Sequence, residues 1–526
     1  MTPLLKLPIG IQAFETMREQ GYVYVDKTRW IHRLATEGMF YFMSRPRRFG
    51  KSLLVSTLKC LFEGRKELFA GLWLAEQTDW PWRAHPVIGV DFNGIPASDP
   101  EELKSSLGRY LGVIATRAGL TLDGEVPAVQ FRELILALHQ QTQTPVVVLI
   151  DEYDKPLIEH LGRGEDGLAI AKANRNILRG FFGVLKDGEV SPRLRFVLLT
   201  GVSRFSKVSV FSELNNLQDL SMNGQYADLL GYTQAELEQH FAGHLERFSA
   251  ALGCSPETVR AKLALRYNGY RFSERDISVY NPFSILNALS ENQLRNYWFA
   301  SGTPTFLINL LQEKRYDLTE MEGVEVMASA FATFDLERLG LEGLLFQTGY
   351  LTIKDVQDDL YTLGYPNQEV KTAFTEALLL AYIEPPDGRM SGQTRRLGIH
   401  LRQGKLEAFF ETLSAIFAAI PYTLNARRDE AYFHTIFYLL LTATGVEATS
   451  EVLTSRGRID LAVEFADRVY VFEFKCGQSA EAALRQIRER GYAVRYAGSG
   501  KTVTLIGINF DPEQRNLAEW RVEGTG

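Results

Sequence analysis

The segment Arg-Pro-Arg-Arg-Phe-Gly-Lys-Ser, residues 45–52, holds a glycine, a lysine and a serine in the order that binds a chain of phosphates. It follows a short apolar run at residues 40–43, which predicts a buried strand, and it precedes a predicted helix over residues 52–62. Backbone N–H groups at the N-terminus of a helix bind anions, and a nearby lysine lies along the phosphates. Lys51 and the hydroxyl of Ser52, which would bind Mg²⁺, therefore predict a site for a nucleoside triphosphate.

One position of this segment departs from the usual phosphate loop. That loop has a first glycine, then four residues, then the glycine that precedes the lysine. Here Arg45 occupies the first of these positions and Gly50 the second. The alternative interpretation is a basic turn that caps a helix. The residues of this segment that we expect to contact the nucleotide are Arg45, Arg48, Gly50, Lys51 and Ser52.

Two acidic residues follow a run of branched aliphatic residues at 146–150, which predicts a strand buried on both faces. Open α/β sheets bind their ligands at the carboxyl ends of the strands, and Asp151 and Glu152 stand at such an end. We expect Asp151 to hold Mg²⁺ and Glu152 to act as the general base that polarises the attacking water. The alternative is a pair of surface acids that ends a strand.

A further apolar run, residues 195–200, predicts the next buried strand and ends at Thr200. A polar side chain at that end could sense the γ-phosphate, and Ser203 and Arg204 follow within reach. We include Thr200 and Arg204 among the predicted nucleotide contacts. A capped strand end and a solvated arginine are the alternative interpretation.

These motifs resemble the AAA-ATPase-like family of bacteria and archaea, over about residues 5–285. The resemblance implies ATP as the nucleotide and Mg²⁺ as the metal, whereas the spacing alone implies only a nucleoside triphosphate. Family members share the arginine at the position of Arg45, and the resemblance leaves open how tightly the chain binds or hydrolyses nucleotide. The segments that carry it are RPRRFGKS at 45–52, LIDEYD at 149–154, LLTGVSRF at 198–205, YVYVDKT at 22–28, YNGYRF at 267–272 and VYNPF at 279–283.

A second group of polar residues lies in the last hundred residues and consists of Asp460, Glu473 and Lys475. In a strand over residues 469–475, alternation places Glu473 and Lys475 on one face and two phenylalanines on the other. Asp460 on the adjacent predicted strand can reach the same spot. Two carboxylates favour a divalent cation between them, and oxygen ligands suit Mg²⁺ or Mn²⁺. The lysine could orient or deprotonate the attacking water and stabilise negative charge, which is the chemistry of phosphodiester hydrolysis.

An amphipathic strand with an exposed Glu and Lys pair is the alternative interpretation of this group. However, twelve residues separate Asp460 from the Glu-x-Lys motif, within a predicted α-β-β-β-α-β order. This pattern resembles the PD-(D/E)XK nuclease superfamily, in the branch fused behind AAA-ATPase-like domains, over about residues 425–510. The residue before Asp460 is isoleucine, so the proline of the superfamily's name is absent, which is common there. The resemblance implies an additional acidic metal ligand, a catalytic glutamine and a further polar residue, which are Glu430, Gln486 and Tyr492.

The elements that must position these groups fall into three parts. Residues 1–285 alternate strands and helices and predict an α/β domain of P-loop type, built on a parallel sheet. A mostly helical middle region, residues 286–420, includes strand-like alternation at 345–365 and a helix at 367–383. Residues 421–526 predict a small restriction-endonuclease-like α/β domain with the order α-β-β-β-α-β.

Composition and charge agree with this organisation. The 526 residues suggest about three domains, and 45% hydrophobic with 23% charged residues excludes disordered, collagen-like and coiled-coil chains. Because 64 acidic residues outnumber 57 lysines and arginines, for a net charge of −7, nucleic-acid binding requires a local basic patch. The arginines that could form such a patch are Arg456, Arg458, Arg485, Arg488 and Arg490.

Cysteine usage and targeting signals predict a compartment. The three cysteines are far apart and form no Cys-x-x-Cys pair, so neither a disulfide framework nor a zinc ribbon is expected. The first residues lack the apolar core and the cleavage site of a signal peptide. The most apolar helical stretch, residues 432–444, is too short to span a bilayer. We therefore expect a cytoplasmic protein without a membrane partner.

Together the two sites predict an ATP-binding and ATP-hydrolysing protein whose C-terminal metal-dependent nuclease is gated or positioned by the nucleotide state. The expected cofactors are ATP and Mg²⁺, with Mn²⁺ as an alternative at the nuclease-like site. The expected partner is a nucleic acid, DNA rather than RNA, and a homo-oligomer is compatible with the sequence. The alternative is a nucleotide-dependent regulatory or defence switch whose nuclease-like domain binds DNA or a partner without cleaving. A protein associated with mobile elements or restriction is a third interpretation.

Overall fold

The computed structural model describes residues 4–204, 214, 216–298, 305–314, 316, 318–331, 340–383, 390–420, 429–446, 448–454, 457–496 and 498–525. Internal contacts group the chain in two compact units. The first contains Met1–Lys314 and Val324–Glu369, and the second contains Arg315–Gly323 and Val370–Gly526. The border between the units falls inside the predicted middle region, and the three-part division of the sequence stays a prediction.

A parallel sheet forms the centre of the first unit. Its strands are β1 (Phe40–Ser44), β2 (Val87–Asp91), β3 (Val146–Asp151), β4 (Leu194–Gly201) and β5 (Gln218–Asp219). They lie in the order β2-β3-β4-β1-β5, and every neighbouring pair is parallel. This arrangement confirms the α/β prediction, and it brings the carboxyl ends of β1, β3 and β4 to one edge of the sheet.

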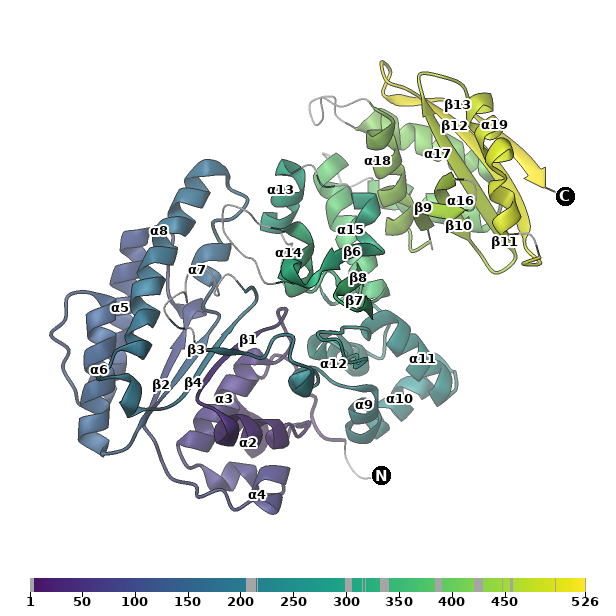
Figure 1. Ribbon diagram of the computed structural model, residues 1–526. Helices are drawn as coiled ribbons and strands as arrows, with labels where there is room; N and C mark the ends of the chain where they lie inside the picture. The colour runs from purple at the N-terminus through teal and green to yellow at the C-terminus, as the bar shows by residue number, and fades with distance from the viewer. Residues whose placement is uncertain are drawn as a thin grey trace. The chain divides into compact units, whose positions relative to one another are not determined.

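Helices cover both faces of this sheet (Figure 1). The helices of this part of the chain are α1 (Phe14–Glu19), α2 (Thr28–Glu37), α3 (Lys51–Phe62), α4 (Trp73–Gln77), α5 (Pro100–Arg117), α6 (Pro127–Thr142), α7 (Lys155–Ile158) and α8 (Gly164–Gly183). α3 packs against β2, β3 and β4, while α5, α6 and α8 pack against one another on the other side. The start of α5 shows how the sequence fixes a helix end: Asp99 accepts hydrogen bonds from the first-turn N–H groups of Glu101 and Glu102.

The remainder of the first unit contains six helices and a small sheet among its described residues. The helices are α9 (Gln234–His240), α10 (Ala242–Leu252), α11 (Pro256–Tyr267), α12 (Pro282–Glu291), α13 (Thr305–Glu313) and α14 (Leu341–Thr348). The strands β6 (Val324–Met327), β7 (Thr352–Gln357) and β8 (Leu360–Gly364) form an antiparallel sheet in the order β6-β8-β7. Strand structure therefore begins at Thr352, whereas the predicted alternation began at residue 345. The side chains of α14 are almost all buried, so that this helix has no amphipathic period.

The second unit contains the elements of the predicted C-terminal domain. Its helices are α15 (Gln368–Ile383, which begins at the unit border), α16 (Met390–Arg402), α17 (Leu406–Ala419), α18 (Glu430–Ala443) and α19 (Ala480–Arg490). Its strands are β9 (Ala448–Thr454), β10 (Gly457–Glu464), β11 (Arg468–Cys476), β12 (Thr502–Asp511) and β13 (Asn516–Thr525). The sheet order is β13-β12-β11-β10-β9, with β11 and β12 parallel and the other pairs antiparallel.

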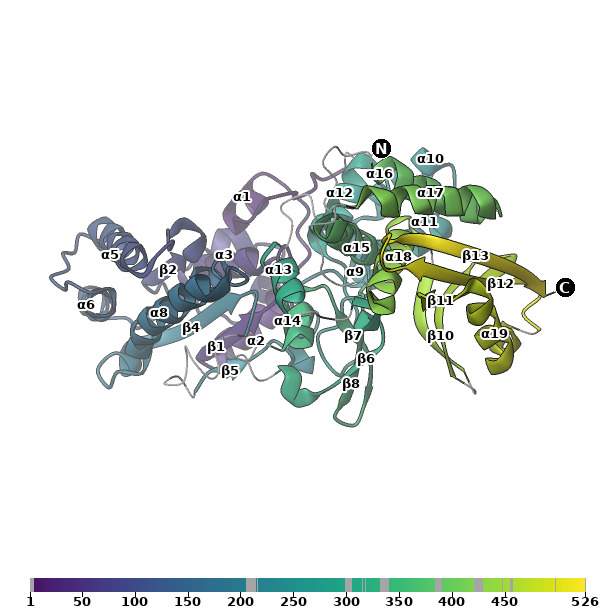
Figure 2. The ribbon, with the colours of Figure 1, turned by 90° about the horizontal axis from the view of Figure 1, so that it is seen from above.

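The order from α18 to β12 is the predicted α-β-β-β-α-β, and β13 is an added edge strand that the sequence interpretation did not include. Figure 2 shows α16 and α17 on one side of this sheet and α19 on the other. Strand alternation in β11 is as predicted, because Phe472 and Phe474 contact Phe437 of α18 while Val471 packs with Leu484 of α19. No helix in the described part of the chain is long and apolar enough to cross a membrane.

Candidate functional site

The predicted phosphate loop runs from the end of β1 to the start of α3. Gly50 is the N-cap of α3 and has φ +94°, a left-handed conformation that glycine adopts without strain. An open cavity of about 530 Å³ begins at this loop. Its lining includes Gly50, Lys51 and Ser52 from the loop and Glu152 and Asp154 from the end of β3. The structure therefore places predicted phosphate-binding groups and the predicted general base at one cavity.

Lys51 and Glu152 form an ion pair in that cavity. The Lys51 Nζ lies 3.2 Å from Glu152 Oε1, and the lysine side chain is only 3% exposed. The same Nζ donates to the backbone carbonyls of Arg45, at 3.1 Å, and Pro46, at 3.3 Å. Glu152 has φ +52°, an uncommon conformation for a residue other than glycine. The lysine predicted to bind phosphate is therefore held by the predicted base.

Asp151 and Thr200 lie directly behind this pair. Asp151, the last residue of β3, accepts a hydrogen bond from the Thr200 hydroxyl on neighbouring β4. Asp151 also accepts the backbone N–H of Glu152, at 3.1 Å. Both side chains are buried. The predicted metal ligand and the predicted γ-phosphate sensor therefore contact each other, although neither belongs to the cavity lining.

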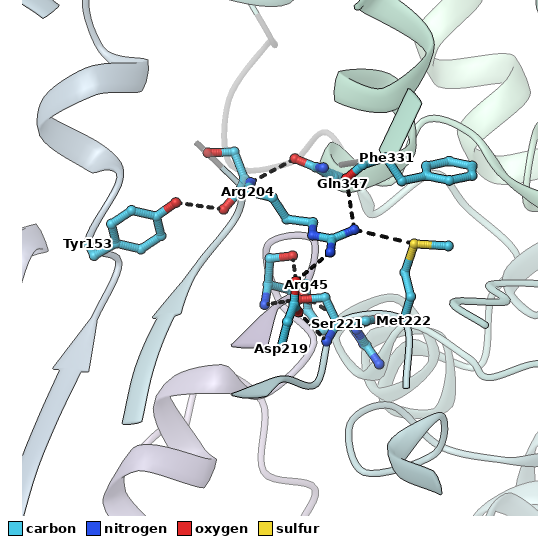
Figure 3. A network of polar contacts seen from close by, with 10 residues as sticks. Arg45, Tyr153, Arg204, Asp219, Ser221, Met222, Phe331 and Gln347 are labelled. Carbon is cyan, nitrogen blue, oxygen red and sulfur yellow. Dashed lines mark hydrogen bonds and ion pairs between the residues drawn. The ribbon is translucent and has the colours of Figure 1, made fainter. Parts of the chain in front are cut away.

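Arg45 and Arg204 belong to a network beside the loop (Figure 3). The Arg45 side chain is buried, donates to the Ser221 carbonyl, and lies 4.3 Å from the centre of the Phe272 ring. Burial lowers the pKa of the Arg45 guanidinium. Arg204 forms an ion pair with Asp219.

Neither of these guanidinium groups lines the cavity of Lys51, because each is held by groups inside the protein. The Arg204 side chain also donates to the Phe331 carbonyl, at 2.8 Å, and its backbone N–H donates to Gln347 Oε1, also at 2.8 Å. The predicted contacts of Arg45 and Arg204 with nucleotide stay predictions. In this structure both arginines support the loop and the end of β4.

Arg48 lines the cavity and connects the loop to later residues of the unit. It donates to the backbone carbonyls of Tyr297 and Trp298, at 3.0 Å each, and lies 3.7 Å from the centre of the Phe283 ring. Burial lowers the pKa of the Arg48 guanidinium. Like Gly50, Arg48 has a positive φ, here +68°, so that these hydrogen bonds hold a turn that is costly for a residue with a side chain.

Asp154 is a buried residue of this site that the sequence interpretation did not select. Its carboxylate accepts hydrogen bonds from the backbone N–H groups of Val202 and Ser203 and from the Ser203 hydroxyl. Burial and the neighbouring charge of Glu152 raise the pKa of Asp154 to about 6. It therefore fixes the turn after β4. The available signal was its place in the LIDEYD segment, three residues after Asp151.

In the second unit, Glu473 is the centre of the predicted carboxylate–lysine site. Its side chain is 0% exposed, and its Oε1 accepts from Gln486 Nε2 on α19 and lies 3.5 Å from Lys475 Nζ. The other oxygen, Oε2, has no hydrogen-bond partner in the described part of the chain. Burial and the nearby Asp460 carboxylate raise the pKa of Glu473 to about 8. Glu473 and Lys475 thus lie together, as strand alternation predicted, and Gln486, which the resemblance implied, contacts Glu473.

Asp460 and Glu430 complete this cluster. The Asp460 Oδ2 accepts the backbone N–H of Phe474, at 2.8 Å, which fixes it beside Glu473. Burial raises the pKa of Asp460. Burial also raises the pKa of Glu430, and the charges of Lys475 and Asp460 act on this pKa as well.

Two aromatic residues hold the frame of this cluster. Tyr492 is buried, and a hydrogen bond links it to Gln486. His434 of α18 bonds through Nε2 to the Asp460 carbonyl, at 2.9 Å, and packs on the Phe474 ring. The bond of His434 to the strand that carries Asp460 had no signal in the sequence.

Acidic side chains pair with part of the predicted basic patch of the second unit. Arg488 on α19 pairs with Glu481 and, at 3.6 Å, with Glu523 of β13. Arg485 is an exposed residue of the same helix. Arg456 lies outside the described residues. Contact with nucleic acid therefore stays a prediction for these arginines.

The donor set of the second site suits a hard divalent cation. Carboxylate oxygens are the ligands that Mg²⁺ and Mn²⁺ prefer, and the unpartnered Glu473 Oε2 offers one such oxygen inside the protein. A buried carboxylate with a raised pKa is costly to ionise, and a cation offsets that cost. Within the described residues, however, no three His, Cys, Asp or Glu side chains are already gathered closely enough to hold a metal ion.

The fold and these sites define a protein with an N-terminal α/β domain of P-loop type and a C-terminal nuclease-like domain. Residues 8–211 match the family described as "Predicted AAA-ATPase", and residues 428–520 match the PD-(D/E)XK nuclease superfamily. A curated relative, described as an uncharacterized protein in the vnfD 5′ region of Azotobacter chroococcum mcd 1, is 39% identical over 532 residues, which cover 99% of both chains. The chain belongs to this predicted AAA-ATPase family and carries a C-terminal PD-(D/E)XK nuclease superfamily domain. The resemblances inferred from the sequence motifs are thereby confirmed.

Proposed function

We propose that this protein hydrolyses ATP in its first unit and, under control of the nucleotide, cleaves phosphodiester bonds of nucleic acid in its second. The observation that carries the proposal is the Lys51–Glu152 ion pair at the cavity beside the phosphate loop. A lysine for the phosphates and a carboxylate for the attacking water lie within contact of each other, at the carboxyl edge of a parallel sheet. This arrangement fits nucleoside triphosphate hydrolysis better than a basic helix cap.

In the proposed hydrolysis, Lys51 exchanges Glu152 for the β- and γ-phosphates of ATP. The released Glu152 carboxylate accepts a proton from water as the water oxygen bonds to the γ-phosphorus and the bond to the β,γ-bridging oxygen breaks. Ser52 and Asp151 would hold Mg²⁺, which neutralises phosphate charge when bound. Thr200 holds Asp151 in place through the hydrogen bond between their side chains.

In the proposed nuclease site, Asp460, Glu473 and Glu430 supply oxygen ligands for Mg²⁺ or Mn²⁺. A bound divalent cation would stabilise the negative charge that develops on the scissile phosphate. Lys475 orients the attacking water, and Gln486 fixes the orientation of the Glu473 carboxylate through its hydrogen bond to Oε1. Local arginines such as Arg485 would contact the phosphate backbone. DNA is the proposed substrate.

Control by nucleotide is supported by the contacts of the turn after β4. Asp154 holds that turn next to Glu152, and Arg204, two residues beyond Val202, bonds to Phe331 and Gln347. Phe331 and Gln347 belong to the segment Val324–Glu369 of the first unit. In the chain, residues of the second unit come directly before this segment and directly after it. A change at the γ-phosphate would therefore reach this connecting segment through residues in direct contact.

The alternative is a nucleotide-dependent switch whose nuclease-like domain binds nucleic acid or a partner without cleaving. One observation favours it, namely that no ready three-residue metal cluster exists among the described side chains. In that case ATP would control binding only. The two functions differ in a single measurable outcome, which is the appearance of cleaved product.

The experiment that tests the proposal incubates the purified full-length protein with double-stranded DNA, single-stranded DNA and RNA, in Mg²⁺ or Mn²⁺, with and without ATP. We expect cleavage of DNA that depends on the metal and changes with ATP, and loss of that cleavage in Asp460→Ala and Lys475→Ala. Lys405→Ala, which removes an exposed lysine of the same unit, is the matched control. Binding without product in every condition would support the switch instead.

The nucleotide half of the proposal is tested separately. Lys51→Ala should lower ATP affinity by about tenfold or more, because the lysine supplies the main positive charge at the phosphates. Lys59→Ala, on the exposed face of the same helix, should leave affinity unchanged. Equal affinity in wild type and Lys51→Ala would refute the phosphate-loop assignment.

A further inference from the structure

A second open cavity lies at the opposite edge of the N-terminal sheet from the phosphate loop. Its volume is about 580 Å³. His85 stands two residues before β2, Pro145 one residue before β3, and Arg195 is the second residue of β4. The phosphate loop, by contrast, follows the carboxyl end of β1. Because all strands of the sheet run in the same direction, the two cavities lie at opposite ends of the strands. Each strand residue adds about 3.3 Å, so that the strands keep the cavities apart.

The wall of this cavity carries positive charge that the protein does not neutralise. Arg83 and Arg195 line it, and neither forms an ion pair with a carboxylate among the residues that the structure describes. Arg195 is held instead by the Ala35 carbonyl, at 2.8 Å from Nη2, and lies 5.6 Å from the centre of the Phe62 ring. Burial lowers the pKa of Arg195, which is the cost of a desolvated cation without a counter-ion. Asp79 is the acidic residue of the lining and is exposed.

The rest of the wall is aromatic, and one of its rings has a buried donor without an acceptor. Trp80 is 9% exposed, and its indole Nε1–H has no acceptor in the described part of the chain. His32 lies edge-on to Trp80, with 6.1 Å between ring centres. His85 donates through Nδ1 to the Pro145 carbonyl, at 2.9 Å, which leaves its Nε2 for another partner. Burial and the two arginines lower the pKa of His85, so that the neutral ring with an accepting Nε2 is favoured.

We propose that this cavity binds a nucleotide unit with a terminal phosphate, separately from the ATP site. The guanidinium groups of Arg83 and Arg195 would hold the phosphate, since guanidinium groups bind phosphate oxygens strongly. The rings of His32, Trp80 and His85 would contact the base. A volume of about 580 Å³ exceeds the needs of a bare phosphate and lies in the usual range of small-molecule sites. A free mononucleotide and the 5′-phosphorylated end of a nucleic acid strand share this chemistry.

Photocrosslinking to the full-length protein tests the proposal with two probes. One is 4-thiothymidine 5′-monophosphate, and the other is a short oligothymidylate with 5′-phosphorylated 4-thiothymidine as its first residue. The reactions contain EDTA, which prevents metal-dependent cleavage, and the labelled peptides are identified by mass spectrometry. We expect label in the peptide that spans residues 79–86. Label from the monophosphate alone identifies a free nucleotide as the ligand, and tighter labelling by the oligonucleotide identifies a strand end.

Two comparisons make this outcome specific. Arg83→Ala should lower the labelling affinity by about tenfold, equivalent to one strong phosphate contact, and an oligonucleotide with a 5′-hydroxyl should be weakened by a similar factor. Arg117→Ala removes an exposed arginine of α5 and should change nothing. Arg83 is exposed, so that Arg83→Ala removes the charge without disturbing the packing of the protein. Absence of label at residues 79–86 with both probes, or equal labelling of Arg83→Ala, would overturn the proposal.

Discussion

The phosphate-loop site and the carboxylate–lysine site differ in how their buried charged side chains are paired. At the first, Lys51 pairs with Glu152, and nearby Arg204 pairs with Asp219, so that positive and negative groups are matched inside the protein. At the second, Glu473 is 0% exposed with one lysine at 3.5 Å, and one of its oxygens lacks a partner among the described residues. The Lys51–Glu152 pair is therefore balanced in charge, whereas the Glu473 cluster holds more acidic than basic side chains.

This difference indicates what each site requires from its ligand. A balanced pair must separate when an anion arrives, so that binding at the first site also changes the contacts of the base. A negative cluster gains stability from a cation, because the cation offsets the repulsion between its carboxylates. Binding of a ligand at the first site should therefore change the contacts of Lys51 and Glu152. The second site is suited to bind a metal ion.

The largest expected effect breaks the negative cluster. Glu473→Gln keeps the size of the side chain and its contact with Gln486 but removes the charge, so that cleavage should fall by about 1,000-fold. Mn²⁺ should raise the thermal unfolding midpoint of the wild type and have little effect on the variant. Cleavage assays and thermal unfolding with and without Mn²⁺ measure both results.

The matched control for this prediction is Glu464→Gln, an acid of β10 that pairs with Lys501 at 2.9 Å. It should behave as the wild type in both measurements. Equal stabilisation of wild type and Glu473→Gln by Mn²⁺ would show that the metal binds elsewhere.

The next effect separates the balanced pair. Glu152→Gln cannot form an ion pair with Lys51, so that ATP should bind several-fold more tightly while its hydrolysis falls by about 100-fold. Isothermal titration and steady-state phosphate release measure the two quantities on the same preparation.

The control for the balanced pair is Glu159→Gln, which lines the same cavity and lies 3.4 Å from Lys155. We expect it to change neither quantity appreciably. Weaker ATP binding with normal hydrolysis in Glu152→Gln would reverse the roles assigned to the pair.

The smallest expected effect is a pH dependence of stability from Asp154. Its pKa is raised to about 6, so that between about pH 4 and pH 6 the folded protein holds a proton that the unfolded chain has released. The contribution of this group to the free energy of unfolding therefore falls as pH rises to 6 and is constant above it. Asp154→Asn lacks this slope.

Thermal unfolding of the wild type and Asp154→Asn from pH 4.5 to 7.5 measures that contribution. The advantage of the wild type should shrink up to pH 6 and then stay level, while Asp166→Asn, an acid in the first turn of α8, follows the wild type throughout. A constant difference between wild type and Asp154→Asn at all pH values would contradict the prediction.

The sequence predicted the groups whose positions follow from regular elements. Parallel strands that end together place Asp151 beside Thr200, and alternation in β11 places Glu473 beside Lys475. The spacing of residues along the sequence does not determine which partner a long side chain contacts. The sequence did not predict that Arg45 lies against the Phe272 ring or that Arg204 pairs with Asp219, and the nucleotide contacts of both arginines stay predictions.

Other features had too weak a local signal to be selected. Asp154 is one acid in an acidic segment, and its role depends on a turn about fifty residues away. The edge strand β13 has charged residues at alternate positions and ends the described chain, so that its pairing with β12 defines it more than its own composition does. Nearly all residues of α14 are buried, so that its sequence lacks the helical spacing of apolar and polar residues from which a helix is usually predicted.

The placement of the loop arginines also bears on where this domain can be divided. The family match ends at residue 211, which is a border of sequence similarity. Arg45 rests on Ser221 and Phe272, and Arg48 on Phe283 and the carbonyls of residues 297 and 298. A fragment cut at the border of similarity would therefore expose two arginines whose partners had been removed. The segment that matches the family is therefore shorter than the segment that must stay together for the loop arginines to keep their partners. That longer segment extends at least to Trp298.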